Sequence, residues 1–166
     1  MANASKEKLS YEDFIATIGE ETRDFVQELH DILSENGCKI EVKSAKSGYV
    51  VSYLQNKKTV LNYVFRKKGL LARIYANHVD QYAEIFKTFP EKLVKAIREA
   101  PLCKRLADPN SCNPKCSMGY DFMLGGERLQ KCRYSAFQFL VCEENAPYLR
   151  AFLEKELEGR TPDVQN

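Results

Sequence analysis

Four short apolar segments follow one another between residues 38 and 78, and their spacing constrains the fold more than any other feature of the sequence. They are rich in Val, Ile, Leu, Tyr and Phe, which are typical of β-strands. The connections between them are Ala45-Lys46-Ser47-Gly48, Asn56-Lys57-Lys58 and Lys67-Lys68-Gly69. Connections this short cannot contain the crossover helices that parallel strands need. The sequence therefore predicts a four-stranded antiparallel meander, with one face available to pack against helices.

Regions with helical periodicity flank the predicted meander. In each of them, apolar residues recur three or four positions apart, as on one face of an amphipathic helix. Ser10 is a suitable N-cap for the first region, and Pro147 is tolerated in the first turn of the last. We expect N-terminal helices, a helical pair and a C-terminal helix at residues 10–37, 79–100 and 145–159, respectively.

Residues 101–142 are predicted to form a cysteine-rich loop, a hairpin and a strand. Gly125-Gly126 is a two-residue connection of the kind that favours the tight turn of a β-hairpin. The resulting register pairs Leu124 with Glu127, Phe122 with Leu129 and Gly119 with Cys132.

Together these elements predict an α+β fold: an antiparallel β-meander packed against helices, with a cysteine-rich loop and hairpin near the C-terminus. A chain of 166 residues is long enough for one hydrophobic core, and two full domains would be difficult to accommodate. We therefore expect a single domain over residues 1–160, followed by a tail at residues 161–166.

The composition favours a soluble cytoplasmic protein. Hydrophobic residues make up 44% of the chain and charged residues 29%, which is typical of globular proteins. The first ten residues are polar, and no apolar run approaches the length that spans a bilayer, so we expect no membrane partner. In a reducing compartment, the six cysteines are expected to be metal ligands, redox thiols or core residues rather than structural disulfides.

Four of the cysteines lie within thirty residues of one another. Three residues separate Cys112 from Cys116, a spacing found in zinc-ligand pairs, while the hairpin and the preceding loop would bring Cys132 and Cys103 to the same point. The sequence predicts a zinc ion bound by Cys103, Cys112, Cys116 and Cys132. This zinc would be structural, because four thiolates leave no coordination position open for a substrate.

The same cysteines allow two other interpretations. In a thiol redox sensor or thiol enzyme, two of Cys112, Cys116 and Cys132 would form a disulfide under mild oxidation, promoted by neighbouring basic residues. Alternatively, they are ordinary loop and core cysteines. Cys38 and Cys142, at the ends of predicted strands, are expected in the core.

Charge is unevenly distributed along the chain, although the net charge is only +2. Residues 38–78 carry nine bases and one acid, whereas residues 1–37 carry three bases and nine acids. Basic side chains interleaved with tyrosines suit an anionic ligand such as nucleic acid, since cations contact phosphates and rings stack on bases. The candidate residues are Lys57, Lys58, Arg66, Lys67, Lys68 and Arg73. The alternative is that lysines in turns are simply solvated and protect the sheet edges from aggregation.

Catalysis receives little support from the sequence. No nucleophile elbow, metalloprotease motif or nucleotide-binding glycine motif occurs, and the two histidines, His30 and His78, lie in no catalytic motif. We therefore predict a non-enzymatic binding or regulatory module with a structural zinc site and a basic sheet. The thiol redox sensor or thiol enzyme is the alternative.

Two segments of the sequence resemble a known group of proteins. VLNYVFRKKGLLARIYANH and CKRLADPNSCNPKCSMGYDFMLGGERLQKCRYSAFQF are similar to segments of uncharacterised bacterial cytosolic proteins that end in a cysteine-bearing module. This resemblance covers about residues 10–158 and implies no activity, since none is known for the group. The front part also resembles frataxin-like α+β domains in its order of elements and its acidic first helix, which is a likeness of fold alone.

Overall fold

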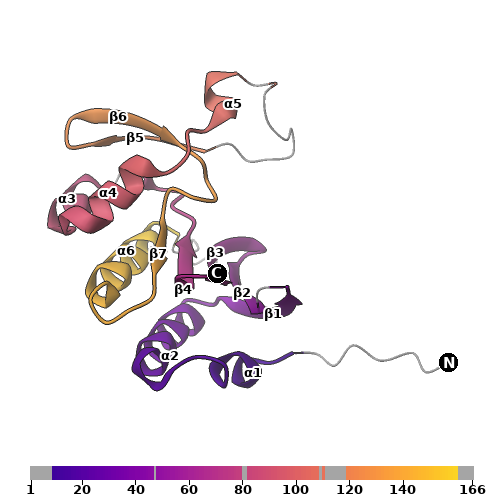
Figure 1. The fold of residues 1–166 in the computed structure, drawn as a ribbon. Helices are drawn as coiled ribbons and strands as arrows, with labels where there is room; N and C mark the ends of the chain where they lie inside the picture. Colours follow the sequence, from indigo (N-terminus) through magenta and orange to yellow (C-terminus); the bar gives the residue numbers. More distant parts are fainter. Residues whose placement is uncertain (1–8, 47, 80–81, 109, 111–118, 161–166) are drawn as a thin grey trace, which may run out of the picture. The chain divides into compact units, whose positions relative to one another are not determined.

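The computed structural model describes residues 9–46, 48–79, 82–108, 110 and 119–160 (Figure 1). Over these residues the predicted α+β fold is confirmed: six helices accompany a mostly antiparallel sheet of five strands and a separate two-stranded sheet. The five strands lie in the order β1-β2-β3-β4-β7, so the first four follow one another as the predicted meander. No described helix is long and apolar enough to cross a membrane.

The boundaries of the elements agree closely with the patterns in the sequence. In chain order they are α1 (Tyr11–Ile15), α2 (Glu20–Glu35), β1 (Lys39–Ala45), β2 (Gly48–Gln55), β3 (Lys58–Arg66), β4 (Gly69–Ile74), α3 (Ala83–Thr88), α4 (Glu91–Glu99), α5 (Lys104–Ala107), β5 (Tyr120–Leu124), β6 (Glu127–Lys131), β7 (Gln138–Leu140) and α6 (Ala146–Gly159).

The chain divides into two compact units. The first comprises Met1–Ala72 and Leu140–Glu143, and the second comprises Arg73–Phe139 and Glu144–Asn166. The boundary therefore falls within β4 and again within β7. A single domain over residues 1–160 stays a prediction.

The first unit is built from α1, α2 and the meander. Ser10 caps α1: its hydroxyl accepts a hydrogen bond from the Asp13 N–H at 3.3 Å, and the Asp13 carboxylate accepts one from the Ser10 N–H at 2.8 Å. Phe14 of α1 is fully buried and stacks on Tyr63 of β3, with ring centroids 5.4 Å apart. Tyr63 pairs with Val51 of β2 in the strand register, so these side chains share one face of the meander. That face packs against the helices.

The turn between β2 and β3 contains two residues in the left-handed region. Asn56 has a φ of 50° and Lys57 a φ of 68°. Positive φ at both central residues is the conformation that two-residue hairpins prefer, and Asn-Gly is the sequence that suits it best. Asn56 tolerates this conformation, whereas Lys57 incurs a steric cost because its Cβ approaches the backbone.

Replacing Lys57 with glycine is expected to raise the free energy of unfolding by about 0.5–1 kcal/mol. Glycine removes the steric cost of the left-handed conformation, and part of this gain is offset by the greater freedom of glycine in the unfolded chain. Urea unfolding of the two proteins measures the difference. Lys58→Gly is the control, since Lys58 begins β3 and glycine weakens a strand. Equal losses of stability in both variants would contradict this account of the turn.

The second unit contains the hairpin and helices α3 to α6. The hairpin register is as expected, with Leu124 opposite Glu127 and Phe122 opposite Leu129. Gly125 and Gly126 have φ values of 58° and 83°, the left-handed conformation that selects glycine at this turn. Phe137 lies at the centre of the core, fully buried. Its ring centroid lies between 5.1 and 5.9 Å from those of Phe86, Tyr120, Phe122 and Phe152.

Candidate functional site

The structure corrects the zinc prediction. No group of three or more His, Cys, Asp or Glu side chains that could hold a metal ion occurs among the residues that the structure describes. Cys103 is buried, and its sulfur accepts a hydrogen bond from the Gly119 N–H at 3.2 Å. Cys132 is a half-buried thiol, and Cys112 and Cys116 lie outside the described residues. Cys103 thus behaves as a small core residue with its sulfur contacted by the backbone.

Hydrogen bonds hold the open end of the hairpin, where the sequence suggested a metal. The Cys103 N–H donates to the Gln130 carbonyl at 3.0 Å, and the Cys132 N–H donates to the Pro101 carbonyl at 2.8 Å. Lys131 is only 6% exposed, and its ammonium group donates to the carbonyls of Arg98 at 2.6 Å and Ala100 at 3.0 Å. These carbonyls end α4, where a cation is favourable. A buried lysine and backbone pairing therefore connect the hairpin to α4.

The other interpretations of the cysteines concern their redox chemistry and their place in the core. The redox alternative, a disulfide between two of Cys112, Cys116 and Cys132, stays a prediction. Cys38 and Cys142, which we expected in the core, are half-buried.

The six candidate anion-binding residues fall at three places. Successive turns of an antiparallel meander alternate between its two ends. Lys57 and Lys58 lie at the β2–β3 turn, and Arg66, Lys67 and Lys68 lie at the β3–β4 turn, which is the opposite end of the sheet. Arg73 lies within β4 in the second unit, where its guanidinium carbon is 5.7 Å from the ring centroid of the partly exposed Tyr134.

Two further lysines lie at the same end of the sheet as the β3–β4 turn. Lys43 is near the end of β1, and Lys46 lies in the β1–β2 turn. A Cβ built on Gly48, which begins β2, would lie 2.8 Å from Cδ2 of Phe65 near the end of β3, so this turn lies beside the end of β3. We call the five exposed cations at this end the basic end: Lys43, Lys46, Arg66, Lys67 and Lys68.

The basic end carries its charge without local compensation. Within the described part of the chain, none of its five cations forms an ion pair with a carboxylate. Glu41 is the one acid of the meander and lies opposite Ser52, further along the strand. Neighbouring cations that are not neutralised raise the local concentration of anions.

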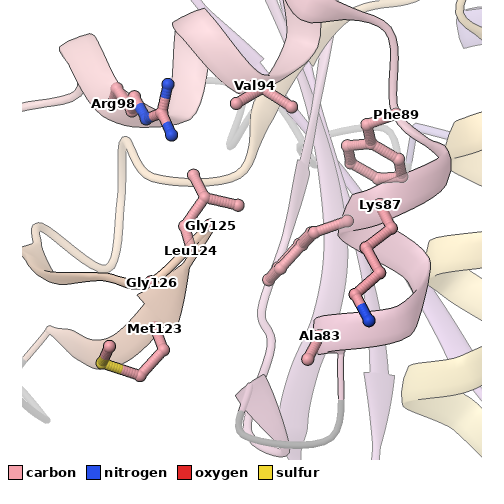
Figure 2. Close-up of a pocket in the computed structure, with 10 residues that line it drawn as sticks. Ala83, Lys87, Phe89, Val94, Arg98, Met123, Leu124, Gly125 and Gly126 are labelled. Carbon is pink, nitrogen blue, oxygen red and sulfur yellow. The ribbon is translucent and has the colours of Figure 1, made fainter.

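A pocket of about 360 Å³ lies between the hairpin turn and helices α3 and α4, within the second unit (Figure 2). Its walls are mainly apolar and include Phe86 of α3, Phe89 at the end of α3 and Leu124 of β5. Figure 2 shows Met123 and Leu124 of the hairpin facing residues of α3 across the opening. The charged residues in the described lining are Lys87 on α3 and Arg98 on α4. Such a pocket has the size and apolar character of a small-ligand site.

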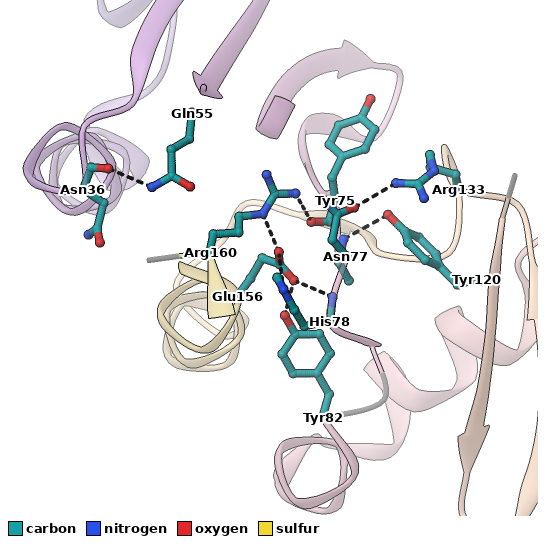
Figure 3. A network of polar contacts seen from close by, with 11 residues as sticks. Asn36, Gln55, Tyr75, Asn77, His78, Tyr82, Tyr120, Arg133, Glu156 and Arg160 are labelled. Carbon is teal, nitrogen blue, oxygen red and sulfur yellow. Dashed lines mark hydrogen bonds and ion pairs between the residues drawn. The ribbon is translucent and has the colours of Figure 1, made fainter. Parts of the chain in front are cut away.

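A buried carboxylate lies at the centre of a polar cluster in the second unit (Figure 3). Glu156 of α6 has no exposed surface. It accepts hydrogen bonds from the backbone N–H of His78 at 3.2 Å, from the hydroxyl of Tyr82 and from Nε of Arg160, and its Oε2 lies 3.2 Å from Nδ1 of His78. Arg160 also donates to the Tyr75 carbonyl at 2.9 Å. The carboxylate thus connects α6 to the segment that follows β4.

The close packing of this cluster has two effects: it raises the pKa of Tyr82, and it restricts the residue type at position 159. Burial, followed by the hydrogen bond to Glu156, raises the pKa of Tyr82 well above its usual range, so the hydroxyl remains a donor. A Cβ on Gly159 would lie 2.8 Å from the ring of His78, so only glycine permits this approach. Because the fully buried Glu156 carboxylate presents no surface to a substrate, the cluster is suited to stabilising the unit rather than to catalysis.

Glu156 was missed by the sequence analysis, although a signal was present. It occurs on the same helical stripe as the apolar residues Leu149, Phe152 and Leu153. A carboxylate on the buried face of a helix must have partners, because burying an unpaired charge is costly. The partners in the segment after β4 lie about eighty residues away, and no local pattern identifies them.

The resemblance to bacterial cytosolic proteins with a cysteine-bearing module, and that to frataxin-like domains, stay predictions. Comparisons of the chain with protein-family models, with curated proteins and with solved structures found no match.

Proposed function

We propose that the protein is a non-enzymatic binding module whose basic end binds a polyanion, with nucleic acid as the partner. The observation that carries the proposal is the gathering of five exposed, uncompensated cations at one end of the meander. The sheet topology brings these residues together from the ends of two strands, β1 and β3, and from the turns that follow them. A phosphate backbone offers repeated negative charges to such a surface, and binding releases counterions.

The backbone at the basic end suits this role because it is fixed by the sheet. Lys43 is paired with Val50 in the β1–β2 register, and Arg66 ends β3 and donates a hydrogen bond from its guanidinium group to the Phe65 carbonyl at 2.9 Å. A backbone that is held by strand pairing loses less freedom on binding than the backbone of a long loop. A cytoplasmic location is part of the proposal, and it is supported by the free thiols of Cys103, Cys132 and Cys142, which a reducing compartment preserves.

A pair of charge-matched variants tests the proposal. The first, Arg66→Gln with Lys67→Gln and Lys68→Gln, removes three cations from the basic end. The second, Lys39→Gln with Lys57→Gln and Lys58→Gln, removes three cations from the opposite end of the same sheet. Fluorescence anisotropy with a labelled single-stranded oligonucleotide, repeated at several salt concentrations, measures the affinity of each.

We expect the first variant to bind more weakly than the unchanged protein and to lower the salt dependence of the affinity by about two units of logarithmic slope. The second variant should bind as the unchanged protein does. Equal effects of the two variants would show that binding follows overall charge and would remove the basic end as a site. An affinity independent of salt would exclude phosphate contacts altogether.

A further inference from the structure

The pocket at the hairpin turn combines apolar walls with positive charge. Its lining consists of Ala83, Phe86, Lys87, Phe89, Val94, Arg98, Met123, Leu124, Gly125 and Gly126. Two of these described residues are cations, and none of them is a carboxylate. A ligand that fills the pocket would therefore place apolar atoms against the rings of Phe86 and Phe89 and meet positive charge at the rim.

The glycines of the hairpin turn leave space for the guanidinium group of Arg98. A Cβ on Gly125 would lie 3.1 Å from a terminal nitrogen of Arg98, so the guanidinium group lies close over the turn. Figure 2 shows Arg98 above the glycine turn, at the edge of the pocket. A side chain at position 125 would compete with Arg98 for this position, and the positive φ of Gly125 disfavours one as well.

The existing partners of the two cations are weak competitors for a ligand. Nε of Arg98 lies 3.6 Å from a carboxylate oxygen of Glu127, and Lys87 pairs with Glu84 at 3.0 Å. All four side chains are largely exposed, and exposed ion pairs contribute little to stability. An anionic ligand whose apolar part occupies the pocket can therefore exchange with these carboxylates at little cost.

We propose that this pocket binds a small amphipathic anion: an unbranched aliphatic carboxylate with about a dozen non-hydrogen atoms, the number that a volume of this size accommodates. The aliphatic chain packs between Phe86, Phe89 and Leu124, and the carboxylate contacts Arg98 and Lys87. The two proposed sites belong to different units and share no residue, so each is tested by variants of its own.

Decanoate is the probe, with decanol as its uncharged counterpart, and calorimetry on the full chain measures both affinities. We expect decanoate to bind about tenfold more tightly than decanol, because a charge-assisted hydrogen bond contributes to its affinity. The amide signals of Gly125 and Gly126 in nuclear magnetic resonance spectra should shift on titration. Equal affinities for the two probes, or shifts confined to other residues, would overturn the proposal.

Filling the pocket with a larger side chain tests whether decanoate binds there. Ala83→Phe places a ring at the exposed edge of the lining, and Ala96→Phe places the same ring on the exposed surface of α4, outside the lining. Decanoate affinity should fall at least about tenfold in the first variant and remain unchanged in the second. If both variants bind decanoate equally well, the ligand occupies another site and the proposal fails.

Removing the charge of Arg98 tests whether this side chain binds the carboxylate of the ligand. Arg98→Gln should lower the preference for decanoate over decanol, while Lys95→Gln, an exposed cation on the same helix outside the lining, should leave the preference unchanged. A preference that persists in Arg98→Gln would overturn the assigned role of Arg98. Oligonucleotide binding is expected to be unaffected in all of these variants, so a failure here is distinguishable from a failure of the basic end.

Discussion

Replacing Glu156 with alanine is expected to lower the free energy of unfolding by about 3–5 kcal/mol, the cost of breaking a buried ion pair. The carboxylate is fully buried, and the side chain of its partner Arg160 is only 6% exposed. The substitution removes the carboxylate to which the Arg160 guanidinium group donates, and it deprives the Tyr82 hydroxyl and the His78 backbone N–H of their acceptor. Urea unfolding followed by circular dichroism measures the loss.

Two companion variants separate the carboxylate from the helix that carries it. Glu154→Ala makes the same substitution at an exposed position of α6 and should change stability by less than about 0.5 kcal/mol. Glu156→Gln keeps the shape and one acceptor oxygen while removing the charge, so its loss should lie between those of the two alanine variants. A Glu156→Ala protein as stable as Glu154→Ala would show that the cluster contributes nothing to folding.

Phe137→Ala should be similarly damaging, with an expected loss of about 3–5 kcal/mol. Phe137 is fully buried and lies among four other aromatic rings of the second unit. Alanine leaves a cavity bordered by rigid rings, which cannot collapse to fill it. Phe137→Leu removes less volume and should cost about 1.5 kcal/mol or less.

The exposed Met123 provides the control for this series. Met123 is 54% exposed, so Met123→Ala should leave the free energy of unfolding almost unchanged. Chemical unfolding of the three variants gives the order directly. If Phe137→Leu were as destabilising as Phe137→Ala, the cavity would not be the cause, and the shape of the aromatic ring would be responsible instead.

The correctly predicted parts of the fold depend on local chemistry. The glycine pair at positions 125 and 126 specifies the hairpin turn, and the turn in turn specifies the register of β5 and β6. Short connections between residues 38 and 78 leave the antiparallel meander as the simplest topology, and the structure has it. In these cases the information lies within a few residues of the feature it determines.

The zinc prediction, which relied on the spacing of the cysteines, is wrong for the residues that the structure describes. The structure connects the same region through Lys131, whose ammonium group binds carbonyls at the end of α4. A lysine in a strand is an ordinary surface residue by its pattern, and its burial depends on α4, some thirty residues earlier in the chain. No spacing of cysteines contains that information.

The positions of the basic residues depend on the sheet topology as well as on the sequence. Their clustering in the sequence suggests one surface, yet the turns of a meander alternate between its ends. That rule, applied to the predicted strands alone, separates Lys57 from Lys67. It also places Lys43 and Lys46 in the second group, since the β1–β2 turn lies at the same end as the β3–β4 turn.

The assignment of β4 and β7 to both units has a practical consequence for dissecting the protein. A fragment that ends at Ala72 lacks residues 140–143, although they belong to the same unit. Such a fragment loses the N–H of Val141, which donates to the Leu70 carbonyl at 2.9 Å, and exposes a new sheet edge along β4. Truncation at the apparent boundary should therefore yield an aggregation-prone product. Fusing residues 138–143 to the end of this fragment should restore the missing strand and cover the exposed edge of β4.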